Sequence, residues 1–483
     1  MAKNSIARNS TIYLAVSFLQ KALSFLLLPL YTRFLSPSAY GLVNVVNTMV
    51  SILSVLFNLS LHGGASRFYY KYKDQPERVK KIWGTTLIAE LINTLILSIV
   101  IVLFHHELMD PFTENIAFYP YILLGIFTAF FSPLFLLFQA RLQAMQNGKA
   151  VGLNNLLFFI INATLTIVFL VFFRWGALGI LGATAITNFI FFVYSFTKML
   201  PFVSLHIDLH VLADILKYSL PLIPYNLASL VAVLFDRLYI NATKGVSQVG
   251  LYSVGFQFAN IMNILTAGVA QAFSPWFFER LEEGPNGKEV IRRNGIFAFS
   301  LFSLLGVLLT YVSPVLLRIM VGENYAGSSS VVPCLAFGYS VYGGYQILCN
   351  GLFSSKTILL PIITFIGAGF NVVLNMVMVP KFGMMGSAIA SMAYNVLVTA
   401  IVAFLAERFE SVGYRFLDIT LPYLLALPCC MLPYFMGDIS PALRIGIETI
   451  VVLFACGLFY YKNRELIKAM SINEKLAAIF NRK

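Results

Sequence analysis

Fourteen apolar segments of helical length, joined by short polar connections, constrain this chain more than any other feature of its sequence. An α-helix that crosses a bilayer needs about 20 mostly apolar residues. Only 11% of the residues are charged, too few to cover a soluble protein of this size. The sequence therefore excludes a soluble enzyme and a nucleic-acid-binding protein. The segments lie at about 10–34, 41–62, 81–104, 118–140, 150–173, 176–199, 217–240, 249–278, 294–320, 329–353, 357–380, 384–406, 417–437 and 440–461.

These segments are continuous and about twice as long as a transmembrane strand, so we expect helices rather than a barrel. The predicted fold class is an all-α polytopic membrane protein with fourteen transmembrane helices. The first segment is too long, and too polar around Gln20 and Lys21, for a cleaved signal peptide. The five cysteines lack the spacing of a metal site or a disulfide framework and are interpreted as small apolar residues.

The distribution of basic residues predicts the orientation. If the amino terminus is cytoplasmic, the inner loops and both tails hold 25 of the 33 Lys and Arg residues. This is the positive-inside pattern, and it places both termini in the cytoplasm. It also accounts for most of the net charge of +12 without an anionic partner.

Weak but ordered matches indicate an internal repeat. Residues 31–34 align with 235–238 at an offset of 204, which places Arg33 and Arg237 at equivalent positions. At an offset of 209, Gly41 matches Gly250, and later matches keep nearly the same offset. Six helices separate the equivalents, so the halves are predicted to be parallel repeats around a central cleft. The predicted domains are 1–205 and 206–406 (six-helix bundles), 407–461 (helices 13 and 14) and 462–483 (an amphipathic cytoplasmic tail).

Polar residues form stripes along equivalent predicted helices. Because polar side chains face acyl chains only at a cost, the stripes are expected to face inward and line a hydrated cleft. The alternative is hydrogen bonding between packed helices, for which Ser and Asn are suited. The residues proposed to line the cleft are Asn44, Asn47, Ser51 and Asn58 in the second helix, and Gln257, Asn260, Asn263 and Gln271 in the eighth.

A few ionisable residues fall inside apolar segments. Lys21 lies near the middle of the first helix, where a charge needs a partner or a function. Glu90 and Asp236 are candidate ion-coupling residues. Two structural alternatives remain open: a buried Lys21–Glu90 ion pair, and an Asp236–Arg237 pair that reaches toward the membrane surface. Arg280 matches Lys71 in the repeat, and this symmetric placement suits an anionic head group as well as the positive-inside bias.

Several short segments carry a resemblance to a known family. They are residues 9–11 (NST), 29–41 (PLYTRFLSPSAYG), 220–224 (LPLIP), 236–237 (DR) and 249–253 (VGLYS). They are similar to the Wzx-type polysaccharide-biosynthesis flippases of the multidrug/oligosaccharidyl-lipid/polysaccharide exporter superfamily. The resemblance covers about residues 1–406.

This resemblance implies a flippase of the bacterial inner membrane, with no catalytic residue and no metal. It implies alternating access that moves an undecaprenyl-pyrophosphate-linked oligosaccharide to the outer leaflet for surface polysaccharide such as O-antigen. Membrane lipids and polysaccharide polymerase machinery are the implied partners, and the family's cleft is usually cationic. By position, Lys21, Arg33 and Arg237 fit the cationic role.

The absence of a nucleotide-binding loop predicts a transporter without ATPase activity. No cofactor is expected, and a proton or sodium gradient is a candidate energy source. Two other functions remain open. A multidrug or cation antiporter would prefer an acidic, aromatic cleft. An integral glycosyltransferase or glycan polymerase would need a sizeable outer loop, which this sequence lacks.

Overall fold

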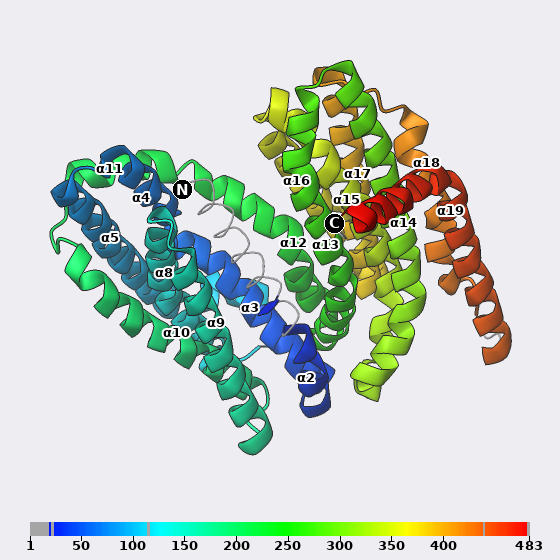
Figure 1. Cartoon of the computed structure of the whole chain (residues 1–483). Helices are drawn as coiled ribbons and strands as arrows, with labels where there is room; N and C mark the ends of the chain where they lie inside the picture. Colours follow the sequence, from blue (N-terminus) through cyan, green and yellow to red (C-terminus); the bar gives the residue numbers. More distant parts are fainter. Residues whose placement is uncertain (1–18, 21–23, 114–115, 438–439, 481–483) are drawn as a thin grey trace. The chain divides into compact units, whose positions relative to one another are not determined.

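The computed structural model describes residues 19–20, 24–113, 116–437 and 440–480 (Figure 1). Regular secondary structure in these residues is helical throughout, with no strand, so the all-α prediction is confirmed for the described part. The chain divides into two compact units. The first comprises residues 1–253, 320–325 and 375–384, and the second comprises residues 254–319, 326–374 and 385–483.

The helices of the first unit pack mainly against α8 and α3. Helix α13 begins in this unit and continues into the second. The helices are α2 (Leu28–Phe34), α3 (Pro37–Asn58), α4 (Leu61–Tyr72), α5 (Pro76–Leu103), α6 (His105–Leu108), α7 (Asp110–Thr113), α8 (Leu123–Ala144), α9 (Gly148–Ile167), α10 (Ala177–Met199), α11 (Leu209–Ser219), α12 (Leu222–Lys244) and α13 (Val246–Leu281).

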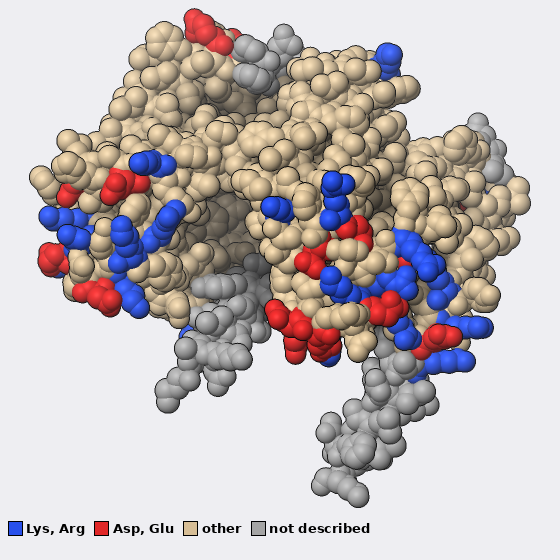
Figure 2. All heavy atoms as spheres, turned by 90° about the horizontal axis from the view of Figure 1, so that it is seen from above, with Lys and Arg blue, Asp and Glu red and all other residues tan. Residues whose placement is uncertain are grey.

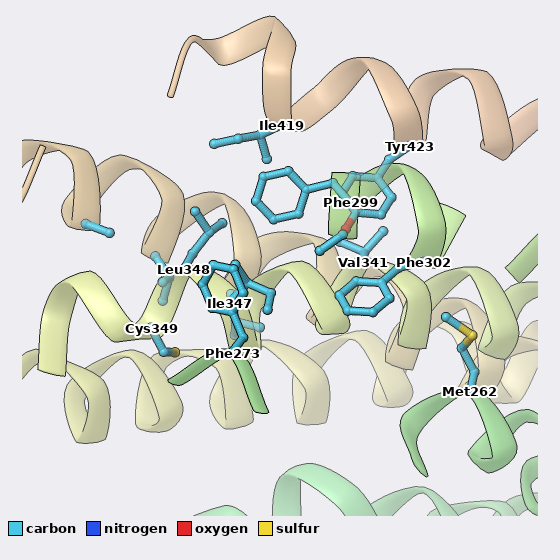
Figure 3. Packing of buried hydrophobic residues seen from close by; sticks show 14 of the residues in the cluster. Met262, Phe273, Phe299, Phe302, Val341, Ile347, Leu348, Cys349, Ile419 and Tyr423 are labelled. Carbon is cyan, nitrogen blue, oxygen red and sulfur yellow. The ribbon is translucent and has the colours of Figure 1, made fainter. Parts of the chain in front are cut away.

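The second unit contains the remaining long helices. Its core is a cluster of aromatic and aliphatic side chains, in which Phe299 and Phe302 of one helix pack near Tyr423 of another (Figure 3). The helices are α14 (Pro285–Met320), α15 (Val332–Ser355), α16 (Leu359–Phe382), α17 (Met384–Phe409), α18 (Phe416–Met431) and α19 (Pro441–Phe480). The end of α16, from residue 375, belongs to the first unit.

Ten helices of the described residues are long and apolar enough to cross a membrane. Three further predicted spans correspond to α12, α13 and α15, helices of 23, 36 and 24 residues. Residues 10–18 and 21–23 of the first predicted span lie outside the described residues, and the span ends with α2. The count of fourteen therefore stays a prediction. The domain limits and the cytoplasmic placement of both termini also stay predictions.

The ends of α3 differ from the sequence prediction. Ser36 caps the start by accepting a hydrogen bond from the amide of Ala39, and Pro37 occupies the first turn, where its missing N–H costs nothing. The helix ends at Asn58 because Leu59 and Ser60 adopt left-handed backbone angles. Asn93 of α5 donates to the Leu56 and Phe57 carbonyls at 3.0 and 2.7 Å, which satisfies the exposed end.

Between the apolar segments 176–199 and 217–240 the sequence predicts a cytoplasmic connector at residues 206–216, which includes Asp208. The structure has a helix there, α11 (Leu209–Ser219). Asp208 caps it by accepting hydrogen bonds from the amides of His210 and Val211. The segment before it docks on α5, where the Ser204 amide donates to the Lys80 carbonyl at 3.0 Å. A side chain at Gly84 would lie 1.9 Å from the Ser204 carbonyl oxygen, so only glycine permits this approach.

A second close approach joins α3 and the start of α13 within the first unit. A Cβ added to Gly41 would lie 1.8 Å from the Val246 carbonyl oxygen, and one added to Gly250 would lie 2.0 Å from the Pro37 carbonyl oxygen. The contact is reciprocal, and the offset of 209 residues relates Pro37 to Val246 as it relates Gly41 to Gly250. Two equivalent segments meeting at a local two-fold axis produce this pattern. It supports our proposal that the chain contains a repeat.

Candidate functional site

The polar stripe of α3 makes most of its hydrogen bonds within its own helix. Asn44 donates to the Tyr40 carbonyl at 2.8 Å, and Ser51 donates to the Asn47 carbonyl at 2.9 Å. Asn47 is exposed, whereas Asn58 is buried and accepts a bond from the Ser60 amide. None of these four side chains bonds to another helix in the described residues. The alternative interpretation, hydrogen bonding between packed helices, therefore does not account for these four side chains.

The stripe of α13 shows the same behaviour in the second unit. Asn263 donates to the Asn260 side chain at 3.1 Å, one turn away on the same helix. Gln257 is partly exposed and Gln271 is exposed. Each stripe thus presents amide groups whose hydrogen-bonding capacity is only partly used.

Asp236 and Arg237 form a buried polar cluster on α12. They are 4% and 7% exposed, so the pair does not reach to solvent as the structural alternative required. The Arg237 amide donates to the Asp236 carboxylate at 2.8 Å, and the guanidinium approaches the same oxygen at 3.4 Å. The Tyr252 hydroxyl donates to the second carboxylate oxygen. The carboxylate is therefore held from two helices, α12 and α13.

Aromatic residues that sequence reasoning missed lie beside this cluster. Tyr40 lies within electrostatic range of Arg237 and contacts Tyr31, with ring centroids 6.2 Å apart. Tyr325 meets Tyr40 edge to face and donates its hydroxyl to the Leu35 carbonyl at 3.1 Å. No sequence period joins residues so far apart. The only signal was the match of residues 31–34 to 235–238.

Glu90 is a buried carboxyl group without a partner. It is 2% exposed, and neither carboxyl oxygen accepts a hydrogen bond in the described part of the chain. A charged carboxylate without a partner is strongly unfavourable in such a position. His62 also has a buried ring nitrogen, Nδ1, without a partner.

The other predicted cations have different surroundings from Arg237. Lys21 lies outside the described residues, so its proposed pair with Glu90 stays a prediction. Arg33 is exposed at the end of α2. Arg280 is partly buried and pairs with Glu283, which lies just beyond the end of the same helix, α13. In the described residues, only Arg237 joins a polar cluster that includes a predicted ion-coupling residue.

Comparisons with known proteins identify the family. Residues 6–280 match the family described as polysaccharide biosynthesis protein. The match covers more than half of the chain, so this protein belongs to that family, and the resemblance drawn from short segments is confirmed. It is 21% identical over 370 residues to protein 1 of the Lsg locus of Haemophilus influenzae, covering 72% of this chain and 84% of that protein. It is 25% identical over 366 residues to an uncharacterized membrane protein of the same organism, with the same coverage.

Solved structures share the fold. The lipid II flippase MurJ, in an inward closed conformation, superposes with a TM-score of 0.70 at 14% identity, covering 94% of this chain and 99% of that one. An inward-facing multidrug resistance MATE transporter of the MOP superfamily gives a TM-score of 0.54 at 16% identity, covering 80% and 94%. At these identities the likeness establishes the fold of the superfamily and not the substrate.

Proposed function

We propose that this protein is a flippase that moves an undecaprenyl-pyrophosphate-linked oligosaccharide from the cytoplasmic to the outer leaflet by alternating access. Family membership and the fold shared with the lipid II flippase support this activity. The observation that carries it is the pair of polar stripes on α3 and α13. Their amides bond within their own helices and remain available to a ligand.

The stripes supply hydrogen bonds that a glycan would otherwise lack while it crosses the membrane. Each sugar hydroxyl left without a hydrogen bond in hydrocarbon costs several kcal/mol. Amide and hydroxyl side chains replace water by donating and accepting at the same time. We propose that Asn44, Asn47, Ser51 and Asn58, together with Gln257, Asn260, Asn263 and Gln271, contact the sugars. The lipid chain stays in the bilayer.

The pyrophosphate needs cations in place of amides. We propose that Lys21, Arg33, Arg237 and Arg280 attract it at successive stages, since guanidinium and ammonium groups form charge-assisted hydrogen bonds with phosphate. With the cell interior negative, outward movement of negative charge is favoured by about 2.3 kcal/mol per charge per 100 mV. The membrane potential can therefore contribute to transport without a nucleotide.

Glu90 and Asp236 are proposed to couple ion entry to transport. Glu90 is buried without a hydrogen-bond partner among the described residues, so a proton or a sodium ion would stabilise it. Asp236 is already held by Arg237 and Tyr252, so an added ion would replace contacts that its carboxylate already makes. We expect Glu90→Gln to slow transport driven by an ion gradient and Asp236→Asn to weaken the local structure as well. Unchanged transport in the double variant would exclude both from coupling.

A drug or cation antiporter is the second candidate, because a multidrug transporter shares the fold and Glu90 supplies a buried acid. The two proposals predict different phenotypes. In a strain that lacks a known polysaccharide flippase, expression of this protein should restore surface glycan and clear lipid-linked glycan from the inner leaflet. Restored drug resistance with no glycan phenotype would favour the antiporter. The Asn44→Leu/Asn47→Leu variant should lose complementation, and an exposed-site variant, Lys73→Gln, should retain it.

A further inference from the structure

Arg141, near the end of α8, is a buried cation without an acidic partner. It is 7% exposed, as buried as Arg237, yet no carboxylate lies within ion-pair distance among the described residues. Arg237 is paired with Asp236, and the partly buried Arg292 is paired with Glu289 and Asp418. No Arg141 nitrogen is sealed from solvent by the described residues as Arg280 Nε is, so the guanidinium keeps donors that remain open to a ligand.

Aromatic side chains hold the Arg141 guanidinium in place without neutralising it. Its central carbon lies 4.0 Å from the centroid of the Phe202 ring, and Tyr69 lies within electrostatic range. The Tyr69 ring in turn contacts Trp83, with centroids 6.2 Å apart. A cation on an aromatic face keeps its hydrogen-bond donors for another group. The guanidinium is thus positioned to bind an anion that the described chain does not itself supply.

A second group in the same packed region also lacks an acceptor. Trp83 is fully buried, and its indole Nε1–H makes no hydrogen bond in the described structure. An indole N–H and a guanidinium can only donate hydrogen bonds. The Arg141 guanidinium, which has donors and no acceptor, therefore indicates a ligand rich in acceptors, not a metal ion or an apolar molecule, and the buried Trp83 ring lies close to Tyr69 as a reporter of this region.

Further cations lie on α4 and α5, which both pack against α8. Arg67 lies 4.5 Å from the Tyr218 ring, and Arg78 lies 5.1 Å from the Tyr72 ring. In the described residues of α4 and α5, the one ion pair is Lys80 with Glu77. Lys and Arg side chains lie over this end of the first unit, with Asp and Glu side chains among them (Figure 2). The positive-inside bias explains exposed cations, but it does not explain a buried arginine without a counter-charge.

We propose that Arg141 is the centre of a binding site for the phosphate head group of an anionic membrane lipid. Arg141 lies one turn from the end of α8, which continues the candidate span Phe118–Ala144. This position is at the depth where lipid phosphates lie. A planar guanidinium binds two phosphate oxygens at once, and the stacked cations of α4 and α5 add attraction at longer range. The site is separate from the residues proposed to contact the transported glycan and does not depend on that function.

The test measures lipid binding to the purified full chain in neutral detergent. Trp175→Phe and Trp276→Phe leave Trp83 as the one tryptophan and make its fluorescence the local signal. Short-chain phosphatidylglycerol should change this fluorescence saturably, and phosphatidylcholine of the same chain length should not. In this background Arg141→Met should weaken binding about tenfold or more, and Arg141→Lys should weaken it less. The matched control Lys73→Gln removes an exposed charge from the same surface and should change affinity less than about twofold.

Two outcomes with the variants overturn the proposal, and one outcome with a competitor does so too. One is equal binding by the parent, Arg141→Met and Arg141→Lys proteins, each shown to be monodisperse. The other is a loss in Lys73→Gln as large as that in Arg141→Met, which would indicate general surface attraction. Polyprenyl pyrophosphate and inorganic phosphate serve as competitors. Binding of polyprenyl pyrophosphate in the absence of any phosphatidylglycerol binding would assign the site to the transported lipid and reject the phospholipid.

Discussion

At the scale of single residues, the Asp236–Arg237 pair combines burial with charge. Removing one member of a buried ion pair leaves an uncompensated charge and typically costs about 3–5 kcal/mol. Arg237→Met removes the guanidinium from the Asp236 carboxylate and leaves the Tyr252 hydroxyl as a side-chain donor to it. We expect this variant to lower the thermal unfolding temperature in detergent markedly. The double variant Asp236→Asn/Arg237→Met should be more stable than Arg237→Met. A double variant that is less stable would contradict the role of Arg237 as the counter-charge of Asp236.

Asp208 gives a prediction that depends on pH. The amide of Val211 donates to its carboxylate and is the main reason that its pKa lies below the ordinary value, with His210 and Lys81 contributing. A carboxyl group with a lowered folded-state pKa stabilises the fold above its unfolded pKa of about 4 and loses this effect as pH falls through the folded value. Hydrogen exchange in α11 should therefore be faster in Asp208→Ala than in the wild type near pH 7, and the difference should shrink below about pH 4. A difference that is independent of pH would contradict a charged cap.

The sequence was sufficient to identify single charged residues in the helices, but not the residues that surround them. Asp236, Arg237 and Glu90 are conspicuous because charges are rare in apolar segments. The contacts of Tyr40 with Tyr325 and of Arg141 with Phe202 were not predicted, because no periodicity joins residues so distant along the chain. Arg141 itself was counted only as one basic residue of an inner loop.

At the scale of helices, the crossing of α3 and α13 depends on two glycines. An alanine Cβ at position 41 would overlap the Val246 carbonyl oxygen, so the helices must separate. Gly41→Ala and Gly250→Ala should each destabilise the protein by about 1–3 kcal/mol. Because both introduce strain at the same contact, the double variant should lose less than the sum of the single losses.

Gly182→Ala is the matched control for this prediction. Gly182 lies within α10, and a Cβ added there would have no neighbouring atom within 4 Å. Alanine favours a helix over glycine by up to about 1 kcal/mol, so this variant should be as stable as the wild type or slightly more stable. Thermal unfolding of the single, double and control variants in one detergent gives the comparison, and strictly additive losses at 41 and 250 would argue against a shared contact.

The apolar segments predicted that helices are present, but they did not predict the residues at which the helices end. The segment 41–62 predicted one helix, whereas the helix is interrupted at Leu59 and Ser60 and the chain continues as a second helix, α4. Leu59 and Leu61 are apolar, so composition gave no sign of the break, and the side-chain amide of Asn93 that stabilises it comes from α5. Likewise, Asp208 was identified only as part of a connector, although it caps α11.

At the scale of the whole molecule, composition is sufficient to predict a helical membrane protein, and family and fold follow from comparison. Composition does not specify which helices are lined by polar groups. Helix α13, which carries one of the two polar stripes, is not among the ten helices of the described residues that are long and apolar enough to cross a membrane. The polar residues that lower its hydropathy are the residues that we propose to serve transport.

The central claim is tested most directly by reconstituting the purified protein into vesicles with undecaprenyl-pyrophosphate-linked oligosaccharide in both leaflets. A glycosidase that cannot enter the vesicles cleaves only outer-leaflet glycan. With active protein, nearly all of the glycan should become accessible with time, whereas vesicles with the Asn44→Leu/Asn47→Leu variant should stop at about the fraction initially outside. Accessibility that stays at this starting fraction with the wild-type protein, under an imposed membrane potential and ion gradient, would contradict the proposed flippase activity.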